Sequence, residues 1–162
     1  MPTPHSLELI SQNAEHTRRL GERVGQALQP GDVLCLQGDL GAGKTTFVQG
    51  LARGWNSLDE VSSPTFILVN VYRRDDGSQL FHMDAYRLDS PAEAEQLDLD
   101  SMLADGALLI EWPERLGGLV PAEHLWLHIT HMDNEQRTLR FTAHGPRATA
   151  LLAALSRMPE AG

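Results

Sequence analysis

The chain has 162 residues, of which 41% are hydrophobic, a proportion typical of one ordinary globular domain. It contains a single cysteine, Cys35, which excludes a framework of intramolecular disulfides and a cluster of cysteine metal ligands. The net charge of −9 disfavours direct binding to the phosphates of RNA or DNA, so any action on nucleic acid is expected to pass through another protein.

The first ten residues, MPTPHSLELI, lack the basic region and the long apolar run of a signal peptide. Elsewhere, no apolar stretch approaches the roughly 20 residues that a helix needs to span a bilayer. We therefore expect a cytoplasmic protein that does not contact a membrane.

Hydrophobic periodicity predicts a helix, a strand and a second helix in the first third of the chain. Apolar or small residues recur at helical spacing across residues 11–29. Residues 32–37, DVLCLQ, form a short and mostly apolar run, as in buried parallel strands. The second helix is predicted to start near Lys44 and to run to about Arg53, with Gly54 at its end.

Two hairpins are predicted in the rest of the chain. Residues 66–74 and 78–86 flank the turn sequence Asp75-Asp76-Gly77, and residues 124–132 and 137–144 form the second pair. Three further elements are a helix that starts at Ser90-Pro91-Ala92-Glu93, a buried strand over residues 106–112, and a last helix after Gly145-Pro146.

The stretch GDLGAGKTTF, residues 38–47, satisfies the phosphate-loop pattern G-x-x-x-x-G-K-[ST] through Gly38, Gly43, Lys44 and Thr45. Glycines allow successive backbone N–H groups to turn towards phosphate oxygens, and the start of a helix adds its positive end. The lysine reaches the β- and γ-phosphates, and the threonine hydroxyl is a ligand for Mg²⁺. The alternative is a glycine-rich turn with an incidental lysine, but the pattern follows a predicted strand and opens a predicted helix, as the motif requires.

Two carboxylates end apolar runs and are candidates for the second half of a nucleotide site. Glu111 ends ALLIE, the more continuous run, and is the candidate for holding Mg²⁺. Asp84 ends LFHMD and is the candidate for orienting the attacking water or holding a switch loop. In the alternative interpretation, each is a strand-end carboxylate that caps a helix or pairs with an arginine.

Together these patterns predict an α/β, three-layer fold like that of P-loop NTPases, with parallel central strands and antiparallel hairpin additions. We expect one P-loop ATPase domain over residues 1–162. Its predicted parts are an N-terminal segment and helix over 1–30, a nucleotide-binding core over 31–120, and a hairpin with a C-terminal helix over 121–162.

Four blocks, taken together, resemble the bacterial TsaE (YjeE) family, the ATPase component of the tRNA threonylcarbamoyladenosine (t⁶A) system. The blocks are GDLGAGKTTF at 38–47, SPTF at 63–66, HMDAYRL at 82–88 and IEWPERL at 110–116. The similarity runs from the first helix to about Leu119. A phosphate loop alone is shared by many families, whereas the four blocks in this order are specific.

The resemblance implies a role for particular residues. Thr45 and Glu111 would bind Mg²⁺, Lys44 would clamp the phosphates, Asp84 would support hydrolysis, and Trp112 matches a functionally sensitive tryptophan. Adenine would lie near residues 9–13 and the late hairpin. The implied nucleotide-binding residues are Gly38, Asp39, Leu40, Gly41, Ala42, Gly43, Lys44, Thr45, Thr46, Thr65 in a switch-like loop, and Arg137 near the adenine.

The resemblance also implies a function, namely a Mg²⁺-dependent ATPase that is required for N6-threonylcarbamoylation of adenosine 37 in tRNAs reading ANN codons. Its partners would be the threonylcarbamoyl transferase subunit and that subunit's non-catalytic paralogue, and ATP hydrolysis would reset their complex between turnovers. Contact with tRNA would be indirect, through these partners. Two alternatives stay open: a small P-loop nucleotide or metabolite kinase, and a protein in which nucleotide binding alone matters.

Overall fold

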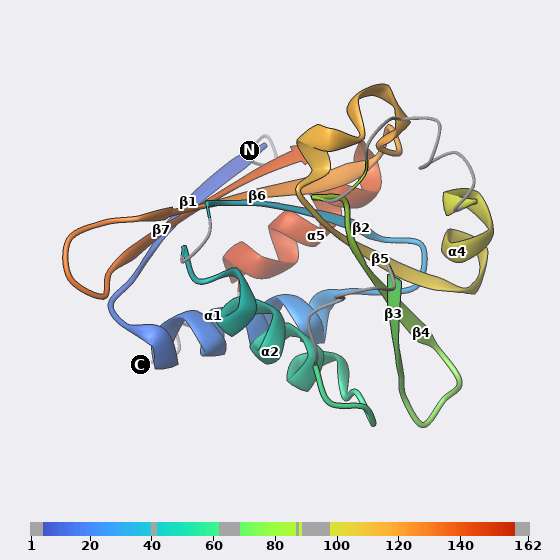
Figure 1. The fold of residues 1–162 in the computed structure, drawn as a ribbon, viewed down its shortest axis with the longest axis horizontal. Coiled ribbons are helices and arrows are strands. Elements are labelled where there is room, and N and C mark those ends of the chain that lie inside the picture. Colours follow the sequence, from blue (N-terminus) through green and yellow to red (C-terminus); the bar gives the residue numbers. More distant parts are fainter. Residues whose placement is uncertain (1–4, 40–41, 62–68, 87, 89–97, 158–162) are drawn as a thin grey trace.

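The computed structural model describes residues 5–39, 42–61, 69–86, 88 and 98–157, and a seven-stranded sheet runs through it (Figure 1). The strand order is β1-β7-β6-β2-β5-β4-β3. The strands are β1 (Ser6–Ser11), β2 (Val33–Gln37), β3 (Val69–Arg73), β4 (Gln79–Asp84), β5 (Gly106–Glu111), β6 (His124–His131) and β7 (Arg137–His144).

The centre of the sheet is parallel and its two edges are antiparallel. Strand β2 lies between β5 and β6 and is parallel to both, and β4 is parallel to β5. The hairpins β3–β4 and β6–β7 are antiparallel, as is the pairing of β1 with β7. This confirms the prediction of parallel central strands with antiparallel additions.

Helices cover both faces of the sheet, which confirms the three-layer α/β fold. Helices α1 (Ala14–Ala27), α2 (Lys44–Trp55) and α5 (Pro146–Arg157) share one hydrophobic core with the first face. Helix α4 (Leu99–Asp105) packs on the other face, together with the short 3₁₀ helices Pro113–Arg115 and Gly117–Leu119. In Figure 1 the paired helices α1 and α2 lie well apart from α4.

Glycines allow α1 and α2 to pack with their backbones in close contact. A Cβ atom on Gly50 would collide with the backbone of Arg18, and one on Gly54 would collide with that of Glu22. The prediction that α2 ends at Gly54 is wrong, because this glycine allows close packing on α1 and lies within the helix. The helix continues to Trp55, and Asn56, in the left-handed conformation at φ 67°, provides the C-cap.

The largest correction lies at the N-terminus, where the predicted helix begins too early. Residues 6–11 form strand β1, which pairs with β7, and α1 begins at Ala14. The Asn13 side chain caps α1 by accepting a hydrogen bond from the backbone N–H of His16 at 2.8 Å. Both predicted hairpins, the strand that ends at Glu111 and the last helix are confirmed, whereas the helix start predicted at residues 90–93 lies outside the described residues.

Candidate functional site

The phosphate-loop sequence lies between the carboxyl end of β2 and the start of α2. Gly43 is the N-cap residue of α2 at φ 104°, a conformation that favours glycine, and no side chain of the described residues caps this helix. The first N–H groups of α2 are therefore available to an anion. At Gly38 a Cβ atom would lie 2.9 Å from the carbonyl oxygen of Ile129, so the close approach of β6 also requires glycine.

Several residues of the predicted phosphate-binding segment are described, on both sides of residues 40–41. The backbone N–H of Ala42 donates to the carbonyl oxygen of Asp39 at 3.0 Å, which closes a turn ahead of α2. On the first turn of α2, Thr45 is exposed and Thr46 is half-buried. Leu40, Gly41 and the predicted switch residue Thr65 lie outside the described residues.

Lys44 is held inside the site, with only 7% of its surface exposed. Its Nζ atom lies 4.0 Å from the centre of the Trp112 ring, a cation–π contact. Burial lowers the pKa of Lys44 below its ordinary value, and the nearby carboxylates of Glu111 and Asp84 oppose that shift. A buried cation that no ion pair among the described residues neutralises is well suited to bind a polyanion.

Trp112 reaches Lys44 because its backbone is in an unusual conformation. Its φ angle is 56°, in the left-handed region that is strained for a bulky residue. The Trp112 ring also packs on Tyr86, with ring centres 4.9 Å apart. The guanidinium group of Arg115 lies over the Tyr86 ring, 5.2 Å from its centre. Strain of this kind persists where the surrounding structure requires it, often at functional sites.

The two predicted carboxylates are direct neighbours. Asp84 ends β4 and Glu111 ends β5, and the two residues are register partners in this parallel pair. Asp84 accepts a hydrogen bond from the backbone N–H of Tyr86 at 2.9 Å, so one of its oxygens also stabilises the local turn. Lys44, Asp84 and Glu111 nevertheless converge at the carboxyl edge of the sheet, where ligands bind in open α/β folds.

A hydrogen-bonded histidine behind Glu111 was missed in the sequence. The Nε2 atom of His82 lies 2.6 Å from Oε2 of Glu111, and its Nδ1 atom lies 2.8 Å from the hydroxyl of Tyr72. His82 is 2% exposed. A signal was present, because His82 precedes Asp84 by two residues and must therefore share its face of β4.

Arg137 lies beside the loop, on the side of the site expected to hold adenine. Its Nε atom donates to the carbonyl oxygen of Ala42 at 2.8 Å. A cavity of about 90 Å³ opens here and is lined by Ala14, Thr17, Gly43, Thr46, Glu135 and Arg137. The first helix and the late hairpin both line this cavity beside the loop, whereas residues 9–13, where adenine was predicted, do not line it.

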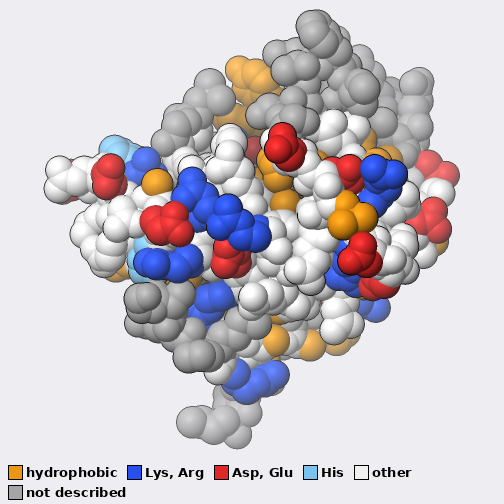
Figure 2. Space-filling model, turned by 90° about the horizontal axis from the view of Figure 1, so that it is seen from below, with side chains coloured by type: hydrophobic (Ala, Val, Ile, Leu, Met, Phe, Trp, Pro, Cys, Tyr) orange, Lys and Arg blue, Asp and Glu red, His pale blue; other side chains and the backbone are white. Residues whose placement is uncertain are grey.

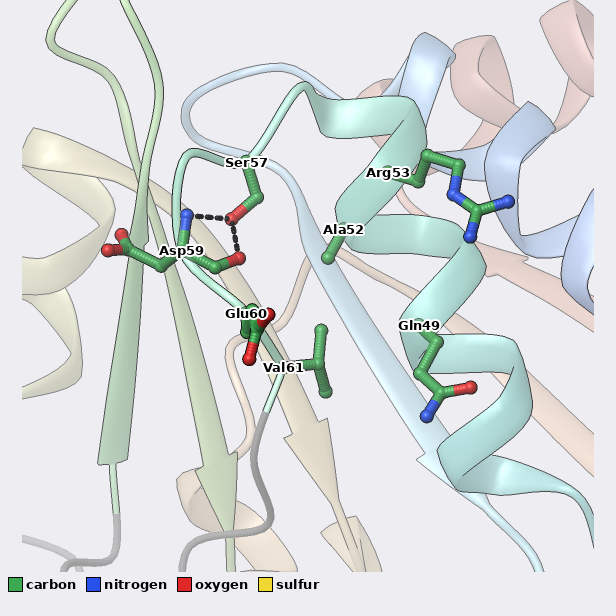
Figure 3. Close-up of a pocket in the computed structure, with 7 residues that line it drawn as sticks. All are labelled: Gln49, Ala52, Arg53, Ser57, Asp59, Glu60 and Val61. Atoms are coloured by element: carbon green, nitrogen blue, oxygen red, sulfur yellow. Dashed lines mark hydrogen bonds between the residues drawn. The ribbon is translucent and has the colours of Figure 1, made fainter.

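A larger cavity of about 430 Å³ lies away from these residues, between α2 and the segment that follows it (Figure 3). In Figure 3, Asp59 and Ser57 are joined by backbone–hydroxyl hydrogen bonds at its edge, with Arg53 on the opposite side. Its lining residues are Gln49, Ala52, Arg53, Ser57, Asp59, Glu60 and Val61. None of these is a predicted site residue, so the larger hollow is not the candidate nucleotide site.

Two kinds of feature are absent from the described residues, which limits the kinds of site that they form. No group of three or more histidine, cysteine, aspartate or glutamate side chains is placed to hold a metal ion. A site with Glu111 and the Thr45 hydroxyl instead suits Mg²⁺, which commonly takes one or two carboxylates and completes its shell with phosphate and water oxygens. Within the same residues, no helix has the length and apolar character needed to cross a membrane.

Comparison with known proteins gives a consistent result. The family model for threonylcarbamoyl adenosine biosynthesis protein TsaE matches residues 11–139. A Bacillus subtilis protein named tRNA threonylcarbamoyladenosine biosynthesis protein TsaE is 40% identical over 146 residues, which is 90% of each chain. A protein of the same name from Aquifex aeolicus is 42% identical over 110 residues, or 67% of this chain and 77% of its own.

The similarity extends to three dimensions. The crystal structure of Bacillus subtilis YdiB superposes with a TM-score of 0.77 at 35% sequence identity. The match covers 94% of this chain and 95% of YdiB. The two chains therefore share one fold over nearly their whole length.

Proposed function

Because this chain belongs to the TsaE family, we propose that it acts in the biosynthesis of tRNA threonylcarbamoyladenosine as a Mg²⁺-dependent ATPase. The observation that carries the ATPase assignment is the convergence of Lys44, Asp84 and Glu111 at the uncapped start of α2. A cation, two strand-end carboxylates and a helix N-terminus are the groups that phosphoryl transfer from a nucleotide to water requires.

In this proposal the loop residues bind the triphosphate. The first N–H groups of α2 hold phosphate oxygens, since Gly43 keeps the helix start open. The ammonium group of Lys44 balances negative charge on the β- and γ-phosphates. The negative charge of a bound polyphosphate would favour the protonated form and so oppose the lowering of the Lys44 pKa by burial.

The two strand-end carboxylates divide the remaining work. Glu111 and the Thr45 hydroxyl would hold Mg²⁺, which would supply positive charge next to the phosphate oxygens. Asp84 would accept a hydrogen bond from the attacking water and so orient it. The cavity beside Arg137 would hold the adenine end, and Arg137 supports the loop through its bond to Ala42.

We further propose that the protein works in the cytoplasm as an accessory of the threonylcarbamoyl transferase subunit and its non-catalytic paralogue. The net charge of −9 supports indirect contact with tRNA. On the face shown in Figure 2, acidic and basic side chains of the described residues are interspersed. This face presents no continuous basic patch within the described residues.

The test is phosphate release from ATP and Mg²⁺ by the purified chain, alone and then with the two transferase-complex subunits and tRNA. We expect slow release that rises clearly when the partners are added, and no release above background from Lys44→Ala. If the partners leave the rate unchanged while a nucleotide or small metabolite becomes phosphorylated, the kinase alternative replaces this proposal.

A further inference from the structure

Three polar side chains form a line across neighbouring strands: Tyr72 on β3, His82 on β4 and Glu111 on β5. Strand register places them on one face of the sheet. Asn70 pairs with His82, so Tyr72, two residues on, shares the histidine's face. Asp84 pairs with Glu111, so His82, two residues earlier than Asp84, shares the face of Glu111.

This line of side chains is buried beneath α1 and α2 and opens only at its glutamate. Tyr72 is 1% exposed and belongs to the core that these helices cover, and His82 is 2% exposed. The Glu111 side chain, at the edge of the sheet, is 14% exposed. A buried polar network is stable only when its members satisfy one another, so these contacts are strongly specified.

The directions of the hydrogen bonds follow from the chemistry of the three groups. An ionised carboxylate only accepts, so the Nε2–H of His82 donates to Oε2 of Glu111. In a neutral imidazole the other ring nitrogen must then accept, so the Tyr72 hydroxyl donates to Nδ1. Tyr72 thus fixes the tautomer and ring orientation of His82, and His82 fixes one oxygen of Glu111.

Fixing Oε2 also fixes the direction of the second oxygen, Oε1, which accepts no hydrogen bond from any residue that the structure describes. A carboxylate held in this way is oriented for a ligand before the ligand arrives, and such outer partners of metal ligands commonly change metal affinity 10- to 100-fold when removed. We propose that His82 and Tyr72 are positioning residues that hold Glu111 in the orientation in which it binds the Mg²⁺ of the nucleotide complex. This inference rests on the proposed function, because it assigns that metal ion to Glu111.

The test measures metal binding rather than turnover. Mn²⁺, a paramagnetic substitute for Mg²⁺, is titrated into the complex of the full chain with ADP and followed by electron paramagnetic resonance. ADP affinity without metal is measured in parallel by calorimetry. We expect His82→Leu to weaken Mn²⁺ binding about 10- to 100-fold and to leave the metal-free ADP affinity within about twofold of wild type.

Two further variants separate positioning from packing. His82→Gln keeps an amide that can donate to Glu111 and accept from Tyr72, so it should restore most of the Mn²⁺ affinity. Tyr72→Phe removes one hydroxyl oxygen from the far end of the line and should weaken Mn²⁺ binding about fivefold, the effect of one hydrogen bond. If His82→Leu does not fold, Tyr72→Phe still tests whether these two residues position Glu111 for the metal ion.

The matched control is Asp32→Asn, a change at another buried carboxylate at the opposite end of the sheet, which should leave Mn²⁺ binding unchanged. The inference is overturned if His82→Leu and Tyr72→Phe bind Mn²⁺ as wild type does, or if His82→Gln is as weak as His82→Leu. If the wild type itself binds ADP but not Mn²⁺, or neither, the proposed function fails first and this inference fails with it.

Discussion

Asp32 and Glu111 are carboxylates at opposite ends of the adjacent parallel strands β2 and β5, and their surroundings differ in kind. Asp32 accepts a hydrogen bond from the backbone N–H of Gln29 at 2.8 Å and pairs with Arg147 at 3.3 Å. Glu111 accepts from His82 and shares its edge of the sheet with Lys44.

The difference separates an end of the sheet whose charges are paired from the end at which we propose that nucleotide binds. At the amino end one oxygen of the Asp32 carboxylate accepts from the backbone and the other pairs with the Arg147 cation. At the carboxyl end the cation rests on an aromatic ring, the helix start is uncapped, and the tryptophan after Glu111 has a strained backbone. Each of these features at the carboxyl end costs stability unless a ligand uses it.

The largest effect is expected at Lys44. Lys44→Ala should lower the ATP hydrolysis rate at least about 100-fold, because it removes the cation aimed at the phosphates. Its thermal stability should stay equal or rise, since the variant no longer buries a charge. Phosphate release and calorimetric melting of the same preparation check both statements, and a variant that melts much lower would mean that Lys44 serves the fold.

Exchanging the two carboxylates for amides tests the comparison directly. Glu111→Gln should lower hydrolysis about 100-fold with little change in stability, because it weakens a metal ligand worth several kcal/mol in the transition state. Asp32→Asn should keep the rate and lower the free energy of unfolding by about 1–3 kcal/mol, because it disrupts a buried hydrogen-bonded pair. Urea denaturation and phosphate release are measured on both variants. A loss of stability in Glu111→Gln together with a loss of hydrolysis in Asp32→Asn would contradict the roles given to the two carboxylates.

A smaller effect is expected at the edge of the site. Arg137→Ala removes the bond to the carbonyl oxygen of Ala42 and one wall of the small cavity. The KM for ATP should rise about tenfold, as for the loss of one charge-assisted hydrogen bond, while kcat changes little. Steady-state kinetics separate the two constants. Arg140→Ala, which removes an exposed neighbour on β7 paired with Glu8, is the matched control and should change neither.

The smallest effect is expected at Cys35, a fully buried residue in the middle of β2, between the amino and carboxyl ends of the sheet. Burial raises the pKa of its thiol from 9.0 to about 12, so the unfolded chain loses this proton before the folded chain does. The thiol's contribution to the free energy of unfolding is fully present below pH 9 and is lost as the pH rises towards 12. At pH 10 the free energy of unfolding has fallen by about 1.4 kcal/mol on this account. Denaturation of wild type and Cys35→Ala should diverge by this amount between pH 8 and 10, and parallel curves would contradict it.

The features that the sequence predicted well depend on local patterns. The loop, the strand-end positions of Asp84 and Glu111 and both hairpins follow from residue spacing and turn chemistry within short windows. Strand β1 was missed because its pairing partner, β7, lies far along the chain, and no local signal specifies that register. Gly54 was taken for a helix end because close contact with α1 and chain reversal both call for glycine.

The site was predicted less completely than the fold, for a related reason. Lys44, Asp84 and Glu111, which the structure brings together, could be predicted as candidates because each occupies a position that a motif or a strand end defines. The contact of Lys44 with Trp112 involves a left-handed backbone angle at Trp112, and the sequence around a tryptophan does not predict such an angle. The link from Tyr72 through His82 to Glu111 depends on the registers of three strands, which only the assembled sheet provides.

The most direct test of the account is the amount of t⁶A in tRNA from bacteria that are depleted of their own TsaE protein and supplied with this chain. Mass spectrometry of the digested tRNA measures it. If the chain acts as an ATPase in t⁶A biosynthesis, the wild-type chain restores t⁶A, and Thr45→Ala and Glu111→Ala, produced at equal levels, do not. Full restoration by variants that bind ATP without hydrolysing it would contradict the account and leave nucleotide binding alone as the function.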